Sequence, residues 1–172
     1  MKPITLLHLS DTQFGRNHRF NRQPLSDDES VDTLLSRLID DLRGLERDHQ
    51  LKPDALILTG DLSEWGMRSE FEEVETFVVG LVEALGLSRD RVAMVPGNHD
   101  INRKACEGYF AECAADEEEP REPFWPKWKW YSAFFEQFYQ DHPGIEFRAD
   151  EPWTLFEIAD LELVVAGLNS TM

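Results

Sequence analysis

The chain has 172 residues, of which 41% are hydrophobic. This length suits one compact domain with a buried core, so we expect a single domain over residues 1–172. Its 17 basic and 34 acidic residues give a formal net charge of −17, which opposes non-specific binding to nucleic acids and to anionic membrane surfaces.

The amino-terminal stretch "MKPITLLHLSD" has an apolar run that is too short for a signal peptide, and no later stretch approaches a membrane span. The two cysteines, Cys106 and Cys113, are seven residues apart, which suits neither a CxxC metal site nor a disulfide framework. We therefore expect reduced thiols and a cytoplasmic protein.

Short apolar runs predict three strands that are buried on both faces, as in a parallel sheet. They cover residues 4–9, 55–58 and 91–95. A helix is predicted between the first two, because apolar residues from Val31 to Leu42 form one stripe and Ser26 and Glu29 are spaced as a capping box.

A second helix is predicted between the second and third strands. Its apolar stripe runs from Phe71 to Leu85, with a capping box at Ser69 and Glu72 and a helix stop at Gly86. The alternation of strands and helices implies right-handed crossovers. We therefore predict an α/β fold: a layered sandwich with a mainly parallel central sheet covered by helices.

The chain after residue 100 is less regular. A helix is expected to begin near residue 101 and to end in an acidic run, followed by an exposed excursion at about 114–150. Residues 127–139 are dense in aromatics, which indicates either a helix packed in the core or a lid; core packing is favoured. The final segment, from residue 153, predicts a hairpin that joins the sheet.

Polar clusters follow all three predicted strands: "SDTQ", "GD" and "GNHD". Ligands of open α/β sheets bind at the carboxyl ends of the strands, so Asp11, Asp61 and Asn98 are expected to converge there. Gly60 and Gly97 allow tight turns beside them. Each polar residue alone is more often a cap or turn residue, but their joint occurrence at successive strand ends favours a metal site. A Rossmann-type nucleotide site is disfavoured, because no GxGxxG follows the first strand.

The motifs D-x-Q, GD and GNHD resemble the first three motifs of the calcineurin-like metallophosphoesterases, whose usual pattern is D-x-H, GD and GNH[DE]. The resemblance is closest to the cyclic-nucleotide-phosphodiesterase-like and exonuclease-like branches. It implies two divalent metal ions, Mn, Fe or Zn, that activate a hydroxide for attack on phosphorus. Asp61 would bridge both ions, Asp11 would bind one and Asn98 the other. His99 would be the catalytic histidine, with Asp100 orienting its ring.

Two departures from the family pattern affect this expectation. Gln13 stands where the family usually has His, although Gln also occurs in relatives similar to manganese-dependent ADP-ribose and CDP-alcohol diphosphatases. The further histidine ligands of the family, including a GHxH motif, are absent, since no histidine follows His142. We therefore expect an N-terminal portion of a longer domain that is incomplete at the C-terminus and binds metal weakly by itself.

A basic cluster after the first motif, "GRNHRF", is the candidate contact for a substrate phosphate. Its members are Arg16, His18 and Arg19, and Arg103 beyond the GNHD motif is a further candidate. The leading hypothesis is a phosphoesterase acting on a small, nucleotide-like phosphodiester or phosphomonoester. The alternative is a scaffold or regulatory module that keeps this fold without turnover.

Overall fold

The computed structural model describes residues 3–18, 33–122 and 125–171. In chain order its main elements are β1 (Leu6–Leu9), α1 (Leu34–His49), β2 (Ala55–Thr59), α2 (Arg68–Leu85), β3 (Val92–Val95), α3 (Arg103–Ala115), α4 (Lys129–Phe138), β4 (Trp153–Ile158) and β5 (Leu163–Leu168). Single 3-10 turns cover Arg89–Arg91, Trp125–Trp128 and Ala159–Leu161.

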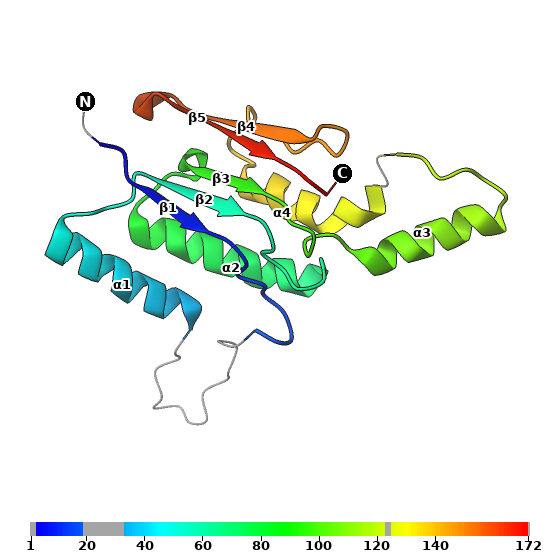
Figure 1. Ribbon diagram of the computed structural model, residues 1–172, viewed down its shortest axis with the longest axis horizontal. Coiled ribbons are helices and arrows are strands. Elements are labelled where there is room, and N and C mark those ends of the chain that lie inside the picture. Colours follow the sequence, from blue (N-terminus) through cyan, green and yellow to red (C-terminus); the bar gives the residue numbers. More distant parts are fainter. Residues whose placement is uncertain (1–2, 19–32, 123–124, 172) are drawn as a thin grey trace.

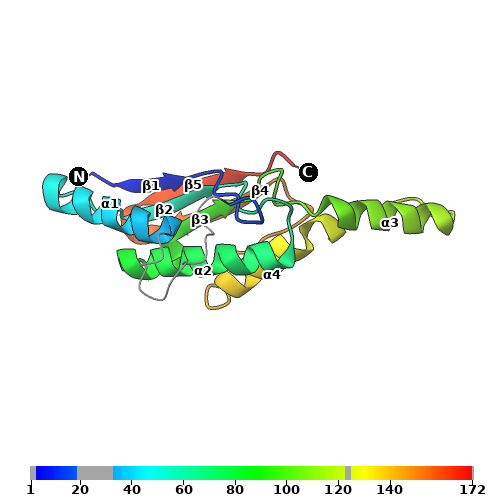
Figure 2. The same ribbon diagram turned by 90° about the horizontal axis from the view of Figure 1, so that it is seen from below.

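The central sheet confirms the predicted α/β fold. Its strands run in the order β1-β2-β3 and pair in parallel, with Leu7 opposite Leu56 and Ile57 opposite Ala93. Helices α1 and α2 are the crossovers, and Figures 1 and 2 show α2 and α4 together on one side of the strands. All three strands point the same way, so their carboxyl ends lie at one edge of the sheet.

Strand β1 differs from the prediction of burial on both faces. Leu7 and Leu9 pack against the core, but Leu6 is 44% exposed. His8 is also exposed, and its Nε2 lies 2.7 Å from the hydroxyl oxygen of Thr59. The strand therefore packs only one face against the core, and the hairpin of β4 and β5 contacts β3 rather than the other face of β1.

The starts of the two crossover helices differ from those expected from the sequence. Helix α1 is capped by Thr33, whose side chain accepts a hydrogen bond from the Ser36 amide; the predicted box of Ser26 and Glu29 lies outside the described residues. Helix α2 begins after Met67 rather than at Ser69, and Gly86 ends it with a φ of 65° as predicted. Eight residues of helix α2 are buried, and each fully buried Val, Leu or Phe contributes about 1.5–3 kcal/mol.

The aromatic segment is part of the core, as favoured from the sequence. Trp128, Tyr131, Phe135 and Phe138 are all at most 1% exposed. The hydroxyl of Tyr139, the residue that follows α4, donates a hydrogen bond to the Val92 carbonyl at 2.7 Å. Thus α4 and its flanking residues, although within the range where an excursion was expected, pack against β3. Figure 1 shows α3, by contrast, extending away from the rest of the molecule.

The predicted C-terminal hairpin is present, but it does not join the parallel sheet. Strands β4 and β5 form a separate antiparallel sheet, with Phe156 opposite Val165. It packs against β3 at Gly167, where an added Cβ would lie 2.2 Å from Val95 Cγ1. None of the helices in the described ranges is both long and apolar enough to cross a membrane.

Candidate metal centre

The polar clusters after β1, β2 and β3 meet at the carboxyl edge of the sheet. Asp11, Asp61 and Asn98 line one cavity of about 490 Å³, between the strand ends and β5. These residues are 50 and 37 positions apart in the chain, so only the parallel register brings them together. The convergence expected from the sequence is therefore present in the structure.

Backbone hydrogen bonds join the loop after β1 to the loop after β2. The amide of Asp11 donates to the Gly60 carbonyl at 3.2 Å, and the amide of Gln13 donates to the Asp61 carbonyl at 2.9 Å. All three of Asp11, Gln13 and Asp61 have positive φ, at 59°, 44° and 52°. Such conformations are uncommon outside glycine and cost about 1 kcal/mol or more each, and they concentrate at functional sites.

A close approach of two glycines places the third loop against the second. A Cβ added to Gly60 would lie 2.6 Å from the Gly97 amide nitrogen, and one added to Gly97 would lie 2.2 Å from Asp61 Oδ1. The same Oδ1 accepts a hydrogen bond from the His99 amide at 2.9 Å. The carboxylate of Asp61 is therefore fixed by the GNHD loop.

Asp100 has a different role from the one expected. It was expected to orient the His99 ring, but its Oδ1 accepts hydrogen bonds from the Ser63 amide at 2.8 Å and the Ser63 hydroxyl at 3.0 Å. Its Oδ2 accepts one from the Gly97 amide, also at 2.8 Å. The carboxylate of Asp100 is fully buried and ties the GNHD loop to the loop after β2.

The His99 ring is instead held by a backbone carbonyl. Its Nδ1 lies 2.9 Å from the carbonyl oxygen of Glu64. A carbonyl only accepts hydrogen bonds, so Nδ1 carries the proton and Nε2 is the ring atom left for substrate chemistry. The carboxylate of Glu64 is hydrogen-bonded by the amide and side chain of Asn17, and these bonds lower the pKa of Glu64.

Burial of Asp100 predicts an unusual dependence of stability on pH. Desolvation raises the pKa of Asp100 from its ordinary 3.8 to about 6, against hydrogen bonds from Gly97 and Ser63 that lower it. The folded state therefore holds this proton more tightly than the unfolded state. The resulting contribution to stability is complete below about pH 4 and is lost as the pH rises to about 6, a loss of about 3 kcal/mol.

This loss is measurable by urea unfolding between pH 4 and 7 against the variant Asp100→Asn. The wild type is expected to lose about 3 kcal/mol relative to Asp100→Asn across this range. Asp116→Asn, at the exposed end of α3, is the matched control and should follow the wild type. Parallel curves for wild type and Asp100→Asn would contradict the assignment.

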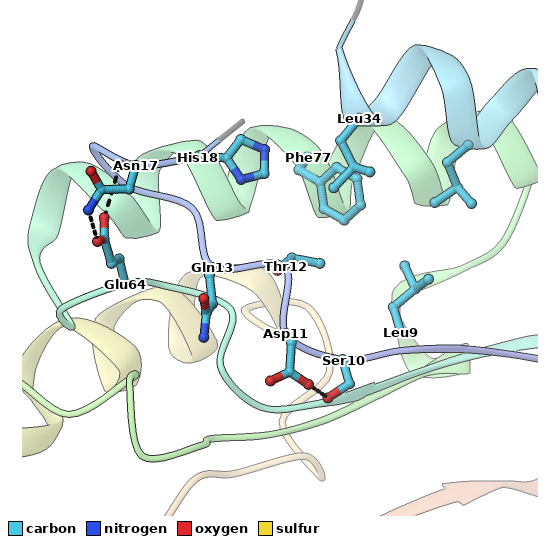
Figure 3. A pocket seen from close by; sticks show the side chains of 11 residues that line it. Leu9, Ser10, Asp11, Thr12, Gln13, Asn17, His18, Leu34, Glu64 and Phe77 are labelled. Atoms are coloured by element: carbon cyan, nitrogen blue, oxygen red, sulfur yellow. Dashed lines mark hydrogen bonds between the residues drawn. The ribbon is translucent and has the colours of Figure 1, made fainter. Parts of the chain in front are cut away.

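A second cavity, of about 410 Å³, opens on the other side of the loop after β1. Asp11, Gln13 and His18 all line it, together with Phe77, and the His18 ring stacks on Phe14 with centroids 4.4 Å apart. Figure 3 shows the side chains of Asp11 and Gln13 pointing to the same side of the loop, away from Phe77. Asp11 is therefore shared by the two cavities, whereas Gln13 lines only this one of the two.

The predicted substrate contacts are divided between two places. His18 lies in the cavity beside Gln13, whereas Arg16 and Arg103 line a third cavity together with Trp65. Arg19 lies outside the described residues. The sequence grouped Arg16 with His18 and gave Arg103 separately, whereas the structure places Arg16 beside Arg103 and apart from His18.

The side chains present offer oxygen ligands rather than a complete metal site. Two carboxylates, Asp11 and Asp61, and two amides, Gln13 and Asn98, surround the strand ends, and such donors suit hard to borderline divalent ions. No group of three or more His, Cys, Asp or Glu side chains able to hold a metal occurs within the described parts of the chain. The donor set thus fits part of the coordination of a divalent ion.

Sequence reasoning missed three residues that build this site. Ser63 bonds Asp100, Glu64 bonds His99, and Trp65 follows them in the same loop. All three come directly after the GD motif in "GDLSEWG". Their position beside a recognised motif was the available signal, but Asp100 and His99, the partners of Ser63 and Glu64, are more than 30 residues away.

Comparisons with known proteins agree with this geometry. Residues 4–165 match the calcineurin-like phosphoesterase family. A stretch of 77 residues is 38% identical to the uncharacterized metallophosphoesterase-like protein YydB of Bacillus subtilis (strain 168). This stretch is 44% of the present chain and only 15% of that relative.

Proposed function

Because the chain belongs to the calcineurin-like phosphoesterase family, we propose that its protein is a metal-dependent hydrolase of phosphoester bonds. The observation that supports this most is the convergence of Asp11, Asp61 and Asn98 on one cavity at the sheet edge. In this proposal two divalent ions would be held by Asp61 as a shared ligand, by Asp11 and Gln13 at one position and by Asn98 at the other.

Each residue of the site has a distinct task in this proposal. Divalent ions bound here would supply a water of lowered pKa and positive charge for the phosphoryl oxygens. The Asp61 carboxylate, fixed by the His99 amide, presents its second oxygen without rotating. The His99 ring, held through Nδ1 by the Glu64 carbonyl, uses Nε2 to donate a proton to the leaving oxygen once the ring is charged.

The proposed substrate is a small nucleotide-like phosphodiester or phosphomonoester. The net charge of −17 opposes a long nucleic-acid strand, whose binding requires a basic track. Arginines near the site, Arg16 and Arg103, can contact one or two phosphates. Manganese, iron and zinc all remain compatible with carboxylate and amide donors.

A second candidate function is a scaffold or regulatory module with this fold and no turnover. Gln13 in place of the usual histidine favours it, because a neutral amide is a weaker ligand than imidazole for these ions. The lack of a three-residue cluster of acidic, His or Cys ligands among the described residues also favours it.

Metal analysis combined with hydrolysis of bis-(p-nitrophenyl) phosphate by the intact protein separates the two functions. We expect bound Mn, Fe or Zn, activity that is lost in EDTA and restored by metal, and an approximately 100-fold lower rate in His99→Ala. His49→Ala, an exposed residue at the end of α1, is the matched control and should keep the wild-type rate. An intact protein without metal and without activity would support the scaffold instead.

A further inference from the structure

A third cavity, beside the candidate metal centre, contains the two arginines named above, but the rest of its lining has no role in the proposed function. It measures about 670 Å³ and lies between the loop after β1, the loop after β2 and the starts of α2 and α3. This volume is in the usual range for small-molecule sites. We call it the Trp65 cavity, after the residue on its apolar wall.

The apolar wall of the Trp65 cavity is exposed yet held in place. Trp65 is 52% exposed and Met67 is 37% exposed. Their backbone amides both donate to Glu70 Oε2, at 2.8 and 3.0 Å, and Glu70 is buried at the start of α2. An indole presented on a fixed loop is a flat surface on which an aromatic ring can stack.

Three cations also line this cavity: Arg16, Arg103 and Lys104. All three are exposed, and none has an ion pair or side-chain hydrogen bond with another described residue. Arg68, by contrast, forms an ion pair with Glu72 at 3.0 Å. In a chain with twice as many acidic as basic residues, a group of cations at one cavity, without ion pairs to the described residues, indicates an anionic ligand.

Three glutamates limit how much negative charge the ligand can carry. Glu70 is engaged by the two backbone amides of the apolar wall, and Glu73 has a further interaction of its own. Glu107 is exposed on α3, one turn beyond Arg103. This mixed lining suits a single phosphate better than a polyphosphate or a nucleic acid, because each added negative charge meets the carboxylates as well.

The Trp65 cavity is connected directly to the His99 loop. Trp65 follows Glu64, whose carbonyl holds the His99 ring. Gly66 packs against the next part of the GNHD loop, since a Cβ there would lie 2.5 Å from the Ile101 carbonyl carbon. A ligand in the cavity is therefore one loop away from the side chain proposed to protonate the leaving group.

We propose that the Trp65 cavity binds a nucleoside monophosphate unit, with the base stacked on Trp65 and the phosphate contacted by Arg16 and Arg103. This assignment rests on the proposed function in one respect only. In that reaction the nucleoside monophosphate unit would be the leaving group, which receives a proton from His99. Binding of the unit itself does not require metal.

The test compares adenosine monophosphate with ribose 5-phosphate, which lacks the base, as ligands of the intact protein in EDTA by calorimetry. Wild type should bind adenosine monophosphate about tenfold more tightly than ribose 5-phosphate. Trp65→Ala should remove this difference, and Trp65→Phe should keep most of it. Trp153→Ala is the matched control, since Trp153 is 47% exposed on β4 and does not line the cavity.

The phosphate contact is tested separately with Arg103→Ala. This variant should weaken both ligands by a similar factor, whereas Arg43→Ala, on the exposed side of α1, should leave both unchanged. Equal affinities of the wild type for the two ligands, or no binding of either, would overturn the proposal. Nucleotide binding without metal-dependent hydrolysis would contradict the proposed function but support this binding site. Hydrolysis without nucleotide binding would support the proposed function but contradict this binding site.

Discussion

Replacing Asp61 with Asn is expected to reduce phosphoester hydrolysis by about 10³-fold, because metal ions contribute several kcal/mol to stabilising the transition state. Asn keeps an oxygen that accepts the His99 amide, and it tolerates the positive φ of 52° at this position. The backbone should therefore be preserved while the charge of the proposed bridging ligand is lost. Hydrolysis of bis-(p-nitrophenyl) phosphate and metal content measure the two effects together.

A matched variant, Gln13→His, is expected to change metal affinity in the opposite direction. It restores the family's usual ligand at a position with a φ of 44°, where histidine is better tolerated than most residues. We expect tighter Mn binding than in wild type by titration, whereas Asp61→Asn should bind more weakly. Unchanged metal content and activity in Asp61→Asn would remove this residue from the metal site.

Replacing Gly97 with Ala is expected to have two effects: it destabilises the fold by about 3 kcal/mol, and it weakens metal binding. The new Cβ would lie 2.2 Å from Asp61 Oδ1 and 2.4 Å from the Asp61 amide nitrogen. Because the amide nitrogen belongs to the Asp61 backbone, rotation of the Asp61 side chain alone cannot relieve the clash, so the two loops must separate. Urea unfolding measures the first effect, and metal titration of the folded protein measures the second.

Gly108→Ala is the control for this substitution. Gly108 lies inside α3, and a Cβ there would meet nothing within 4 Å. Alanine should stabilise the helix by about 0.5–1 kcal/mol, since it loses less conformational freedom on folding than glycine. A Gly97→Ala protein as stable as wild type would show that the two loops can separate without loss.

Strand and helix patterns in the sequence predicted the architecture because the apolar periodicity of each segment is local. The strand segments and the helix stop at Gly86 follow from that periodicity and from turn chemistry. The cap of α1 at Thr33 was not predicted, because Thr33 lies within the apolar stripe itself. The hairpin was predicted, but its separation from the parallel sheet was not, because whether it pairs with a strand distant in the chain leaves no local signal.

The candidate site was predictable in its residues but not in their hydrogen bonds. Asp11, Asp61 and Asn98 were identified from strand ends and motifs, and the structure places them on one cavity. The partners of Asp100 and His99 were not, because both are set by contacts of the loop after β2. Those contacts depend on how closely Gly60 and Gly97 approach each other, which no spacing within a motif specifies.

The positive φ angles of Asp11, Gln13 and Asp61 also bear on how such a site can change over evolution. Apart from glycine, Asp, Asn and His enter this backbone region most readily, and all three carry atoms that bind metal. A single substitution can therefore exchange a carboxylate for an amide or an imidazole with little disturbance of the loop. The preferred metal can therefore change during evolution through the chemical type of the ligand atoms, while the backbone that positions these side chains stays the same.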